Sequence, residues 1–241
     1  MIDFKSLFAR KKDQAAAAAP AAPAKENKFR KSLQGLTQFD LKSLFSGKKQ
    51  FVGLDVGSSS LKLVEILGDK GAYTMNRFLM TPLARGVIVD GAVTDVDALA
   101  EAIKGLFQNS SCQKKEIVAS LSGHNVIIKK APFPQMEDKE LQETIRDEAG
   151  KYLPFDNMDD VNFDFQVLGP AAGNPNLNEV IIVAAKKEVM DGYVEAVELA
   201  GLSLAIMDVD SFALETMYME NYDYEENDVV VIANIGAGIT N

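Results

Sequence analysis

The sequence has 241 residues, of which 47% are apolar and 25% charged, and its formal net charge is −10 at pH 7. This is the composition of an ordinary globular protein with one large or two modest domains, and it excludes wholesale disorder. We find no apolar run long enough to cross a membrane and no signal-peptide pattern. One cysteine (Cys112) and one histidine (His124) can form neither an internal disulfide nor a Cys/His zinc site. We therefore expect a cytoplasmic protein of bacterial type.

Charge divides the chain into two parts. Residues 1–50 hold 11 Lys+Arg and 4 Asp+Glu, a net charge of +7, whereas residues 51–241 hold 14 and 31, a net charge of −17. The second part is too acidic for a general nucleic-acid binder. The basic part is most simply a solvated, solubilising tail, and it also fits an anionic membrane face, an acidic partner or the acidic body itself.

The basic head, residues 1–50, contains a repeated short motif. Residues 15–24 form an Ala/Pro spacer that cannot pack a core, so we expect the head to be largely disordered. On either side of the spacer stand Asp3–Phe8 and Asp40–Phe45, each followed by a basic cluster. Each copy suits a short helix that folds on a membrane surface or in a groove. Two interpretations stay open: a bivalent docking element and a chance duplication.

From Phe51 onward, apolar runs of strand and helix period alternate. Strands are expected at 51–56, 61–67, 72–80, 116–121, 125–130, 161–167, 180–185, 204–209 and, as a final buried strand, 228–233. Helices are expected after a cap at Thr94, over 141–149, over 189–200 and over 211–220. Pro132 and Pro134 are expected to break the chain, and residues 169–178 to form a loop. The pattern predicts a mixed-sheet α/β architecture.

A loop of small residues follows the first strand. It reads Asp55-Val56-Gly57-Ser58-Ser59-Ser60-Leu61-Lys62. Backbone N–H groups and serine hydroxyls can donate to phosphate oxygens, Lys62 can add a positive charge, and Asp55 can hold a hydrated magnesium ion. The spacing is not that of a P-loop, and a tight hairpin whose polar side chains satisfy the turn backbone explains the same residues.

A second loop repeats this logic after the last expected strand. Its residues are Asn234, Ile235, Gly236, Ala237, Gly238, Ile239, Thr240 and Asn241. Two such hairpins facing each other could hold a triphosphate from both sides. The pair is therefore a more specific signal than either loop alone.

These loops resemble the phosphate-1 and phosphate-2 loops of the actin-like ATPase superfamily, whose domains have an RNase H-like fold. Within the superfamily, the sequence is most similar to the PilM family of type IV pilus assembly proteins, which is related to FtsA. The similarity covers residues 51–241, and its most specific segments are 53–65, 143–155 and 232–237. It implies domain 1 of this fold, with subdomain 1A at 51–80 and 186–241 and an inserted small α/β subdomain 1C at 81–185. The family's second domain is absent from the sequence, so we expect a truncated form of a longer protein.

The resemblance also implies a site and partners. ATP with Mg²⁺ is expected, with Asp55 on the metal side. The phosphate contacts would come from Gly57, Ser58, Ser59, Ser60 and Lys62 and, opposite them, from Asn234, Gly236, Ala237, Gly238 and Thr240. The expected partner is the N-terminal cytoplasmic peptide of the inner-membrane protein PilN, bound in a groove involving 1C near Tyr152, Phe155 and Phe163. Further inner-membrane components of the pilus machinery are expected beside it.

One departure from the superfamily concerns catalysis. Asn234 stands where the superfamily usually has Asp, and an amide cannot act as a carboxylate toward a metal-bound water. We therefore expect a nucleotide-binding scaffold at the cytoplasmic face of the inner membrane, at most a slow ATPase, that serves pilus assembly and twitching motility. The alternative is a protein-interaction module of the same fold that is indifferent to nucleotide. In that case Tyr152, Phe155 and Phe163 would line the functional surface, unless they are ordinary core residues.

Overall fold

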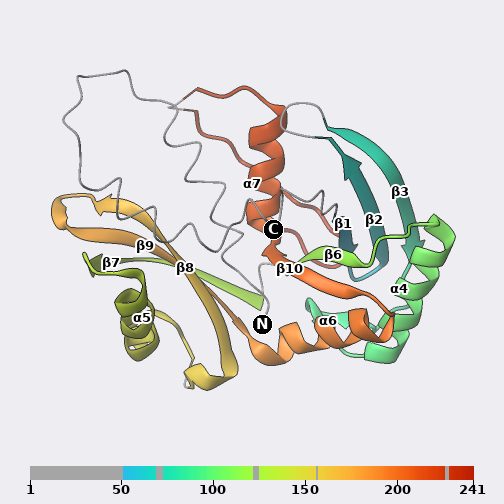
Figure 1. Cartoon of the computed structure of the whole chain (residues 1–241), viewed down its shortest axis with the longest axis horizontal. Helices are drawn as coiled ribbons and strands as arrows, with labels where there is room; N and C mark the ends of the chain where they lie inside the picture. Colours follow the sequence, from blue (N-terminus) through green and yellow to red (C-terminus); the bar gives the residue numbers. More distant parts are fainter. Residues whose placement is uncertain (1–50, 69–72, 122–124, 156, 226–227) are drawn as a thin grey trace.

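The computed structural model describes residues 51–68, 73–121, 125–155, 157–225 and 228–241 (Figure 1). The basic head with its two motifs and the turn containing His124 lie outside the described residues. Within the described ranges, none of the helices has the length and apolar character needed to span a bilayer.

A mixed five-stranded sheet forms the centre of the larger body, in the order β10-β6-β1-β2-β3. Its strands are β1 (Val52–Val56), β2 (Ser60–Leu67), β3 (Thr74–Pro82), β6 (Glu116–Leu121) and β10 (Ser203–Val209). β1, β2 and β3 form the predicted antiparallel meander, whereas β6 runs parallel to β1, and β10 parallel to β6. The carboxyl ends of β1, β6 and β10 therefore meet at one edge of the sheet.

Helices lie on both sides of this sheet. α4 (Val96–Ser110) and α6 (Lys187–Leu199) pack against each other on one side, and α7 (Asp210–Asn221), which follows β10 directly, lies on the other (Figure 1). The predicted apolar stripe of α4 is confirmed, because Leu99, Ile103 and Leu106 are fully buried.

The predicted cap of α4 is wrong by one residue. The side chain of Asp95 accepts the Ala98 N–H at 2.9 Å and is the N-cap. Thr94 instead donates its hydroxyl to the carbonyls of Gly86 and Val87. That hydroxyl is used to close the short hairpin of β4 (Ile88–Val89) and β5 (Ala92–Val93), so it is not available to the helix.

A separate three-stranded antiparallel sheet has the order β7-β9-β8. It consists of β7 (Val126–Pro134), β8 (Val161–Ala171) and β9 (Asn174–Lys186), with α5 (Asp138–Tyr152) and a short 3₁₀ turn (Met158–Asp160) between β7 and β8. The predicted buried run of β9 is confirmed, because residues 180–185 are all buried in the central strand. α4 and β6 pair or pack with the larger sheet, so the separate small sheet begins at β7. The subdomain limits of 81–185 stay a prediction.

Two expected breaks are strands in the structure. Pro132 and Pro134 lie within β7, which tolerates them because it is an edge strand and its outward N–H groups need no partner strand. The loop expected at 169–178 is a hairpin in which β8 and β9 continue to Ala171 and from Asn174. Gly173, with a φ of +83°, allows the tight reversal.

The final strand expected at 228–233 is not formed. The run is exposed, with Val229 at 92% and Val231 at 88% of full exposure, and has no secondary structure. The described part of the chain offers it no neighbouring strand. An apolar run cannot become a buried strand without a partner for its N–H and C=O groups.

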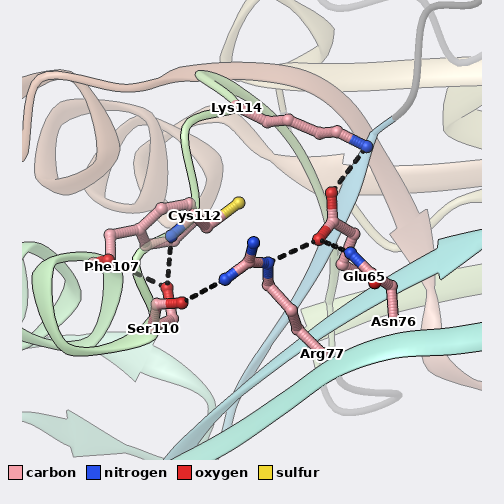
Figure 2. A network of polar contacts seen from close by, with 7 residues as sticks. All are labelled: Glu65, Asn76, Arg77, Phe107, Ser110, Cys112 and Lys114. Carbon is pink, nitrogen blue, oxygen red and sulfur yellow. Dashed lines mark hydrogen bonds and ion pairs between the residues drawn. The ribbon is translucent and has the colours of Figure 1, made fainter.

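A buried carboxylate ties the meander to α4 (Figure 2). Glu65 on β2 is 4% exposed and accepts Arg77 Nε at 2.8 Å, Asn76 Nδ2 at 2.6 Å and Lys114 Nζ at 2.7 Å. Arg77 also donates to the Ser110 carbonyl at the end of α4, at 2.7 Å. These donors, with Lys114 first, hold the pKa of Glu65 below its usual value although burial opposes them.

Glu65→Gln is expected to lower the free energy of unfolding at pH 7 by about 1–3 kcal/mol, because it leaves two cations without their carboxylate. The lowered pKa means that the folded protein releases this proton more readily than the unfolded chain. The contribution of Glu65 is therefore present above its unfolded pKa and is lost as the pH falls through the folded pKa. Urea denaturation of both proteins from pH 7 to pH 3 measures the difference. Glu101→Gln is the control, because its exposed pair with Lys104 contributes little; equal losses in the two variants would contradict the assignment.

Candidate functional site

The loop between β1 and β2 is a tight turn that needs its glycine. The Gly57 N–H donates to the Ser60 carbonyl at 3.0 Å, and a Cβ on Gly57 would lie 3.1 Å from that oxygen. The Ser59 carbonyl accepts the Leu83 N–H at 2.9 Å, which fastens the turn to the segment after β3. Ser58 and Ser59 therefore form the tip of a turn at the carboxyl end of β1, and these two hydrogen bonds hold the turn in place.

The second loop has the same construction. The Gly236 N–H donates to the Ile239 carbonyl at 2.9 Å, and a Cβ on Gly236 would lie 2.7 Å from that oxygen. Asn234 and Asn241 exchange two backbone hydrogen bonds of 2.8 and 2.9 Å, and Ile235 and Thr240 form a bridge between them. Ala237 and Gly238 thus occupy the tip that Ser58 and Ser59 occupy in the first loop.

The two tips meet in space. A Cβ on Gly238 would lie 3.1 Å from the Ser58 hydroxyl oxygen and 3.8 Å from the Ser58 Cβ. A side chain at position 238 would therefore require Ser58 to shift by a few tenths of an ångström. Of the loop residues that the sequence singled out, the structure thus brings Ser58 of the first loop against Gly238 of the second.

Asp55 and Lys62 face each other on the adjacent strands β1 and β2. Their side chains form an ion pair with Lys62 Nζ 2.6 Å from Asp55 Oδ2, and both are partly exposed. The ammonium expected to contact phosphate is therefore bound to the carboxylate expected to face the metal. An ion pair this exposed contributes little to stability and is easily exchanged for other partners.

Asp210, at the start of α7, is a site residue that the sequence reasoning missed. Its carboxylate accepts a hydrogen bond from the Ser120 hydroxyl at the end of β6. Burial raises the pKa of Asp210, the Ser120 bond opposes the shift, and the negative charge of Asp55 adds to it.

Tyr193 on α6 belongs to the same neighbourhood. Burial first, and then the charges of Asp210 and Asp55, raise the pKa of its hydroxyl to about 12. The hydroxyl donates to the Gly91 carbonyl at 2.9 Å. The Tyr193 side chain is thus neutral, and its hydrogen bond to Gly91 holds it in place near the two carboxylates.

The position of Asp210 directly after a strand of the parallel part of the sheet could have identified it as a candidate. It follows the third of three strands whose carboxyl ends share an edge, and ligand-binding groups of α/β sheets gather at such edges. Local periodicity predicts a strand at 204–209 and a helix at 211–220, but it does not reveal which end of the sheet their junction reaches.

Asp55 and Asp210 are the side chains at this end of the sheet that could contribute carboxylates to a magnesium ion. Across the described ranges, no group of three or more His, Cys, Asp or Glu side chains comes together. Mg²⁺ usually needs only one or two carboxylates, because it keeps waters and takes phosphate oxygens as its other ligands. Repulsion between Asp55 and Asp210 is the electrostatic condition that a cation would relieve.

The three aromatic residues expected to line a partner groove lie beside the core of the smaller sheet. Tyr152, Phe155 and Phe163 are half-buried and pack against the cluster between α5 and that sheet. The Tyr152 ring lies 5.3 Å from that of the buried Phe133, and the Arg146 guanidinium lies 5.2 Å from the centre of the Phe163 ring. Part of each side chain therefore serves packing, while the remainder reaches the surface.

The mixed sheet with helices on both of its sides defines an α/β domain. A family model described as type IV pilus assembly protein PilM matches residues 53–241. A solved structure described as the PilM-PilN type IV pilus biogenesis complex matches at 33% identity with a TM-score of 0.63, over 70% of this chain and 50% of that chain. The chain thus belongs to the PilM family of type IV pilus assembly proteins. It spans about half the length of that relative.

Two more distant structures also match. The cytoplasmic domain of EpsL, an inner-membrane component of the type II secretion system of Vibrio cholerae, shows 11% identity and a TM-score of 0.45, over 66% of this chain and 57% of that one. A Bacteroides thetaiotaomicron protein with an actin-like ATPase fold and unknown function shows 11% identity and a TM-score of 0.35, over 72% and 57%.

Gly238→Ala is expected to displace Ser58, because the new methyl group would lie within 3.1 Å of its hydroxyl oxygen. The measurement is the ¹H–¹⁵N spectrum, in which the amide signals of Ser58 and Ser59 should shift. Gly105→Ala in α4 is the matched control, since nothing lies within 4 Å of its Cβ. Unchanged signals for the first loop in Gly238→Ala would show that the two tips do not meet in solution.

Proposed function

We propose that this chain is a nucleotide-binding scaffold of type IV pilus assembly that acts at the cytoplasmic face of the inner membrane. The observation that carries the proposal is the contact between the tips of two matching glycine turns, beside a pair of carboxylates. Phosphate oxygens bound beside the contacting tips would meet backbone N–H groups and hydroxyls of both turns. ATP with Mg²⁺ is the ligand that combines a polyphosphate with the cation that the carboxylates favour.

Each site residue has a role in this proposal. Ser58, Ser59 and Ser60 offer hydroxyls and N–H groups from one side, and Thr240 with the backbone of 236–238 offers them from the other. Asp55 and Asp210 would hold the hydrated magnesium ion, which neutralises phosphate charge when bound. Lys62 would exchange its bond to Asp55 for one to a phosphate oxygen.

ATP hydrolysis is the part of the superfamily's activity that this sequence supports least. Asn234 supplies an amide, not a carboxylate, at the start of the second loop. Without a carboxylate base there, the chain would hydrolyse ATP slowly at most. The output of the site would then be a change of conformation, which alters the surface presented to partners.

Saturating ATP with Mg²⁺ is expected to raise the melting temperature by several degrees, because a ligand at a hundred times its Kd stabilises by about 2.7 kcal/mol. Asp55→Asn and Asp210→Asn should each abolish the magnesium-dependent part of the shift. Differential scanning fluorimetry with ATP, ATP–Mg²⁺ and ATP–EDTA measures it. Asp97→Asn, on the exposed first turn of α4, is the control and should keep the full shift.

Asp210→Asn should also leave the free protein as stable as the wild type or more stable at pH 7. A folded pKa above the unfolded one means that this carboxyl contributes stability below its unfolded pKa and loses it as the pH rises through the folded pKa. Because an Asn side chain does not ionise, Asp210→Asn removes this loss of stability at high pH. If no nucleotide shifts the wild type at any concentration, the site is not a nucleotide site.

Docking of the PilN cytoplasmic N-terminal peptide is the second part of the proposal. Its support is family membership and the relative described as a PilM-PilN complex. The half-buried aromatics Tyr152, Phe155 and Phe163 are the proposed groove, and other inner-membrane pilus components would assemble around it. Through them the chain would serve twitching motility.

Phe155→Ala is expected to weaken binding of a fluorescent PilN N-terminal peptide by about tenfold, the effect of losing one buried aromatic contact of about 1.4 kcal/mol. Fluorescence anisotropy measures the Kd. Leu168→Ala, partly exposed on β8 of the same sheet, should leave it unchanged. Equal effects of the two variants would place the groove elsewhere, and affinity that is the same with and without ATP–Mg²⁺ would favour the nucleotide-independent interaction module.

A further inference from the structure

The outer face of β2 and β3 carries a patch of exposed apolar side chains. Ile66, Met75, Phe78 and Met80 are 51%, 65%, 54% and 57% exposed. Cross-strand pairing joins Ile66 to Met75 and places Phe78 and Met80 opposite Val64 and Lys62. We call these four residues the β2–β3 patch. Exposed apolar side chains gathered on one sheet face mark an interaction surface.

The described helices leave this part of the sheet open. The inner side chains of β2, such as Leu61 and Leu63, are fully buried in the cluster that includes α4. On the outer side α7 packs against β10 and β6, at the other end of the strand order. Among the described residues, therefore, no helix covers the outer side of β2 and β3, whereas a sheet in a layered fold is normally covered on both faces.

The chain enters the sheet beside the patch. β1 begins at Val52, which pairs with Glu65, the residue before Ile66. Ile66 in turn pairs with Met75 on β3. Strands are about 4.8 Å apart, so β3 lies about 10 Å from the point where the preceding segment joins β1.

The preceding segment carries an apolar motif within reach. Leu41, Leu44 and Phe45 have the i, i+3, i+4 spacing of one helical face. Six residue steps separate Phe45 from Phe51, and at about 3.4 Å per residue they span up to about 20 Å. This is twice the distance that the sheet geometry requires.

We propose that the second copy of the repeated motif, Asp40–Phe45, docks in cis on the β2–β3 patch. Its Leu41, Leu44 and Phe45 would cover the β2–β3 patch. Lys48 and Lys49 would stay in solvent at the end of the sheet. The first copy, Asp3–Phe8, has the same chemistry but lies more than 40 residues from β1. The short tether gives the second copy the higher effective concentration at the patch, so the first copy remains free.

Disulfide trapping in the full chain tests this docking. In a Cys112→Ser background, Ser43→Cys and Thr74→Cys place thiols in the second motif and at the exposed start of β3. The rate of intramolecular disulfide formation is compared with and without Leu44→Ser/Phe45→Ser. The matched control is Leu7→Ser/Phe8→Ser, which makes the same change in the first copy.

Docking predicts that Leu44→Ser/Phe45→Ser slows trapping at least about tenfold, since two apolar side chains leave the patch, whereas the control is unchanged. Phe78→Ser should slow it similarly. Equal rates in all variants would mean that tethering alone brings the thiols together, and the proposal would be wrong. Disulfide-linked dimers in place of monomers would assign the patch to a second copy of the chain.

Two further measurements distinguish docking of the second motif on the β2–β3 patch from binding of that motif to a membrane. Hydrogen exchange of the amides of 74–80 should be faster in Leu44→Ser/Phe45→Ser than in the wild type and unchanged in the control. Co-sedimentation with anionic phospholipid vesicles tests the membrane. If Leu44→Ser/Phe45→Ser removes vesicle binding while trapping and exchange stay as in the wild type, the motif binds lipid and not the patch.

Discussion

The parallel alignment of β1, β6 and β10 is the constraint on which the site depends. It brings the carboxyl ends of three strands, distant in sequence, to one edge, so that Asp55, Ser120 and Asp210 become neighbours. Parallel neighbours require long crossover connections. Here those connections supply α4 and α6, which bury the inner face of the same sheet, so one topological choice produces both the core and the polar edge.

The carboxylates of Glu65 and Asp210 have pKa shifts in opposite directions, because their neighbours differ. Glu65 receives three charged or amide donors and its pKa is lowered, so its ionised form stabilises the meander and its contact with α4. Asp210 has the Ser120 hydroxyl and a neighbouring negative charge, and its pKa is raised. The first arrangement is complete in the protein itself. The second is the arrangement that a bound cation would stabilise, which is why we propose Asp210 as a ligand-side carboxylate.

The sequence predicted the elements that local periodicity determines: the meander, the α4 stripe, β9, β10 and the two glycine turns. It failed where a neighbour distant in sequence decides. Pro132 and Pro134 are tolerated because β7 lies at an edge, and the apolar run at 228–233 stays exposed for lack of a partner strand. Asp210 was missed because only the strand order reveals which ends share an edge. Local patterns specify strands, whereas sheet order is a property of the whole chain.

The two glycine turns are alike in hydrogen bonding but unequal in support. The first is held between β1 and β2 and by the bond from Leu83 to Ser59, so its donors are preorganised. Among the described residues, the second is held by its own Asn234–Asn241 ladder and follows the exposed run of Val229 and Val231. A ligand that bridges both tips must spend part of its binding free energy on fixing the second turn against the first. Under the proposed function, occupancy of the site would in this way change the position of the second turn relative to the first.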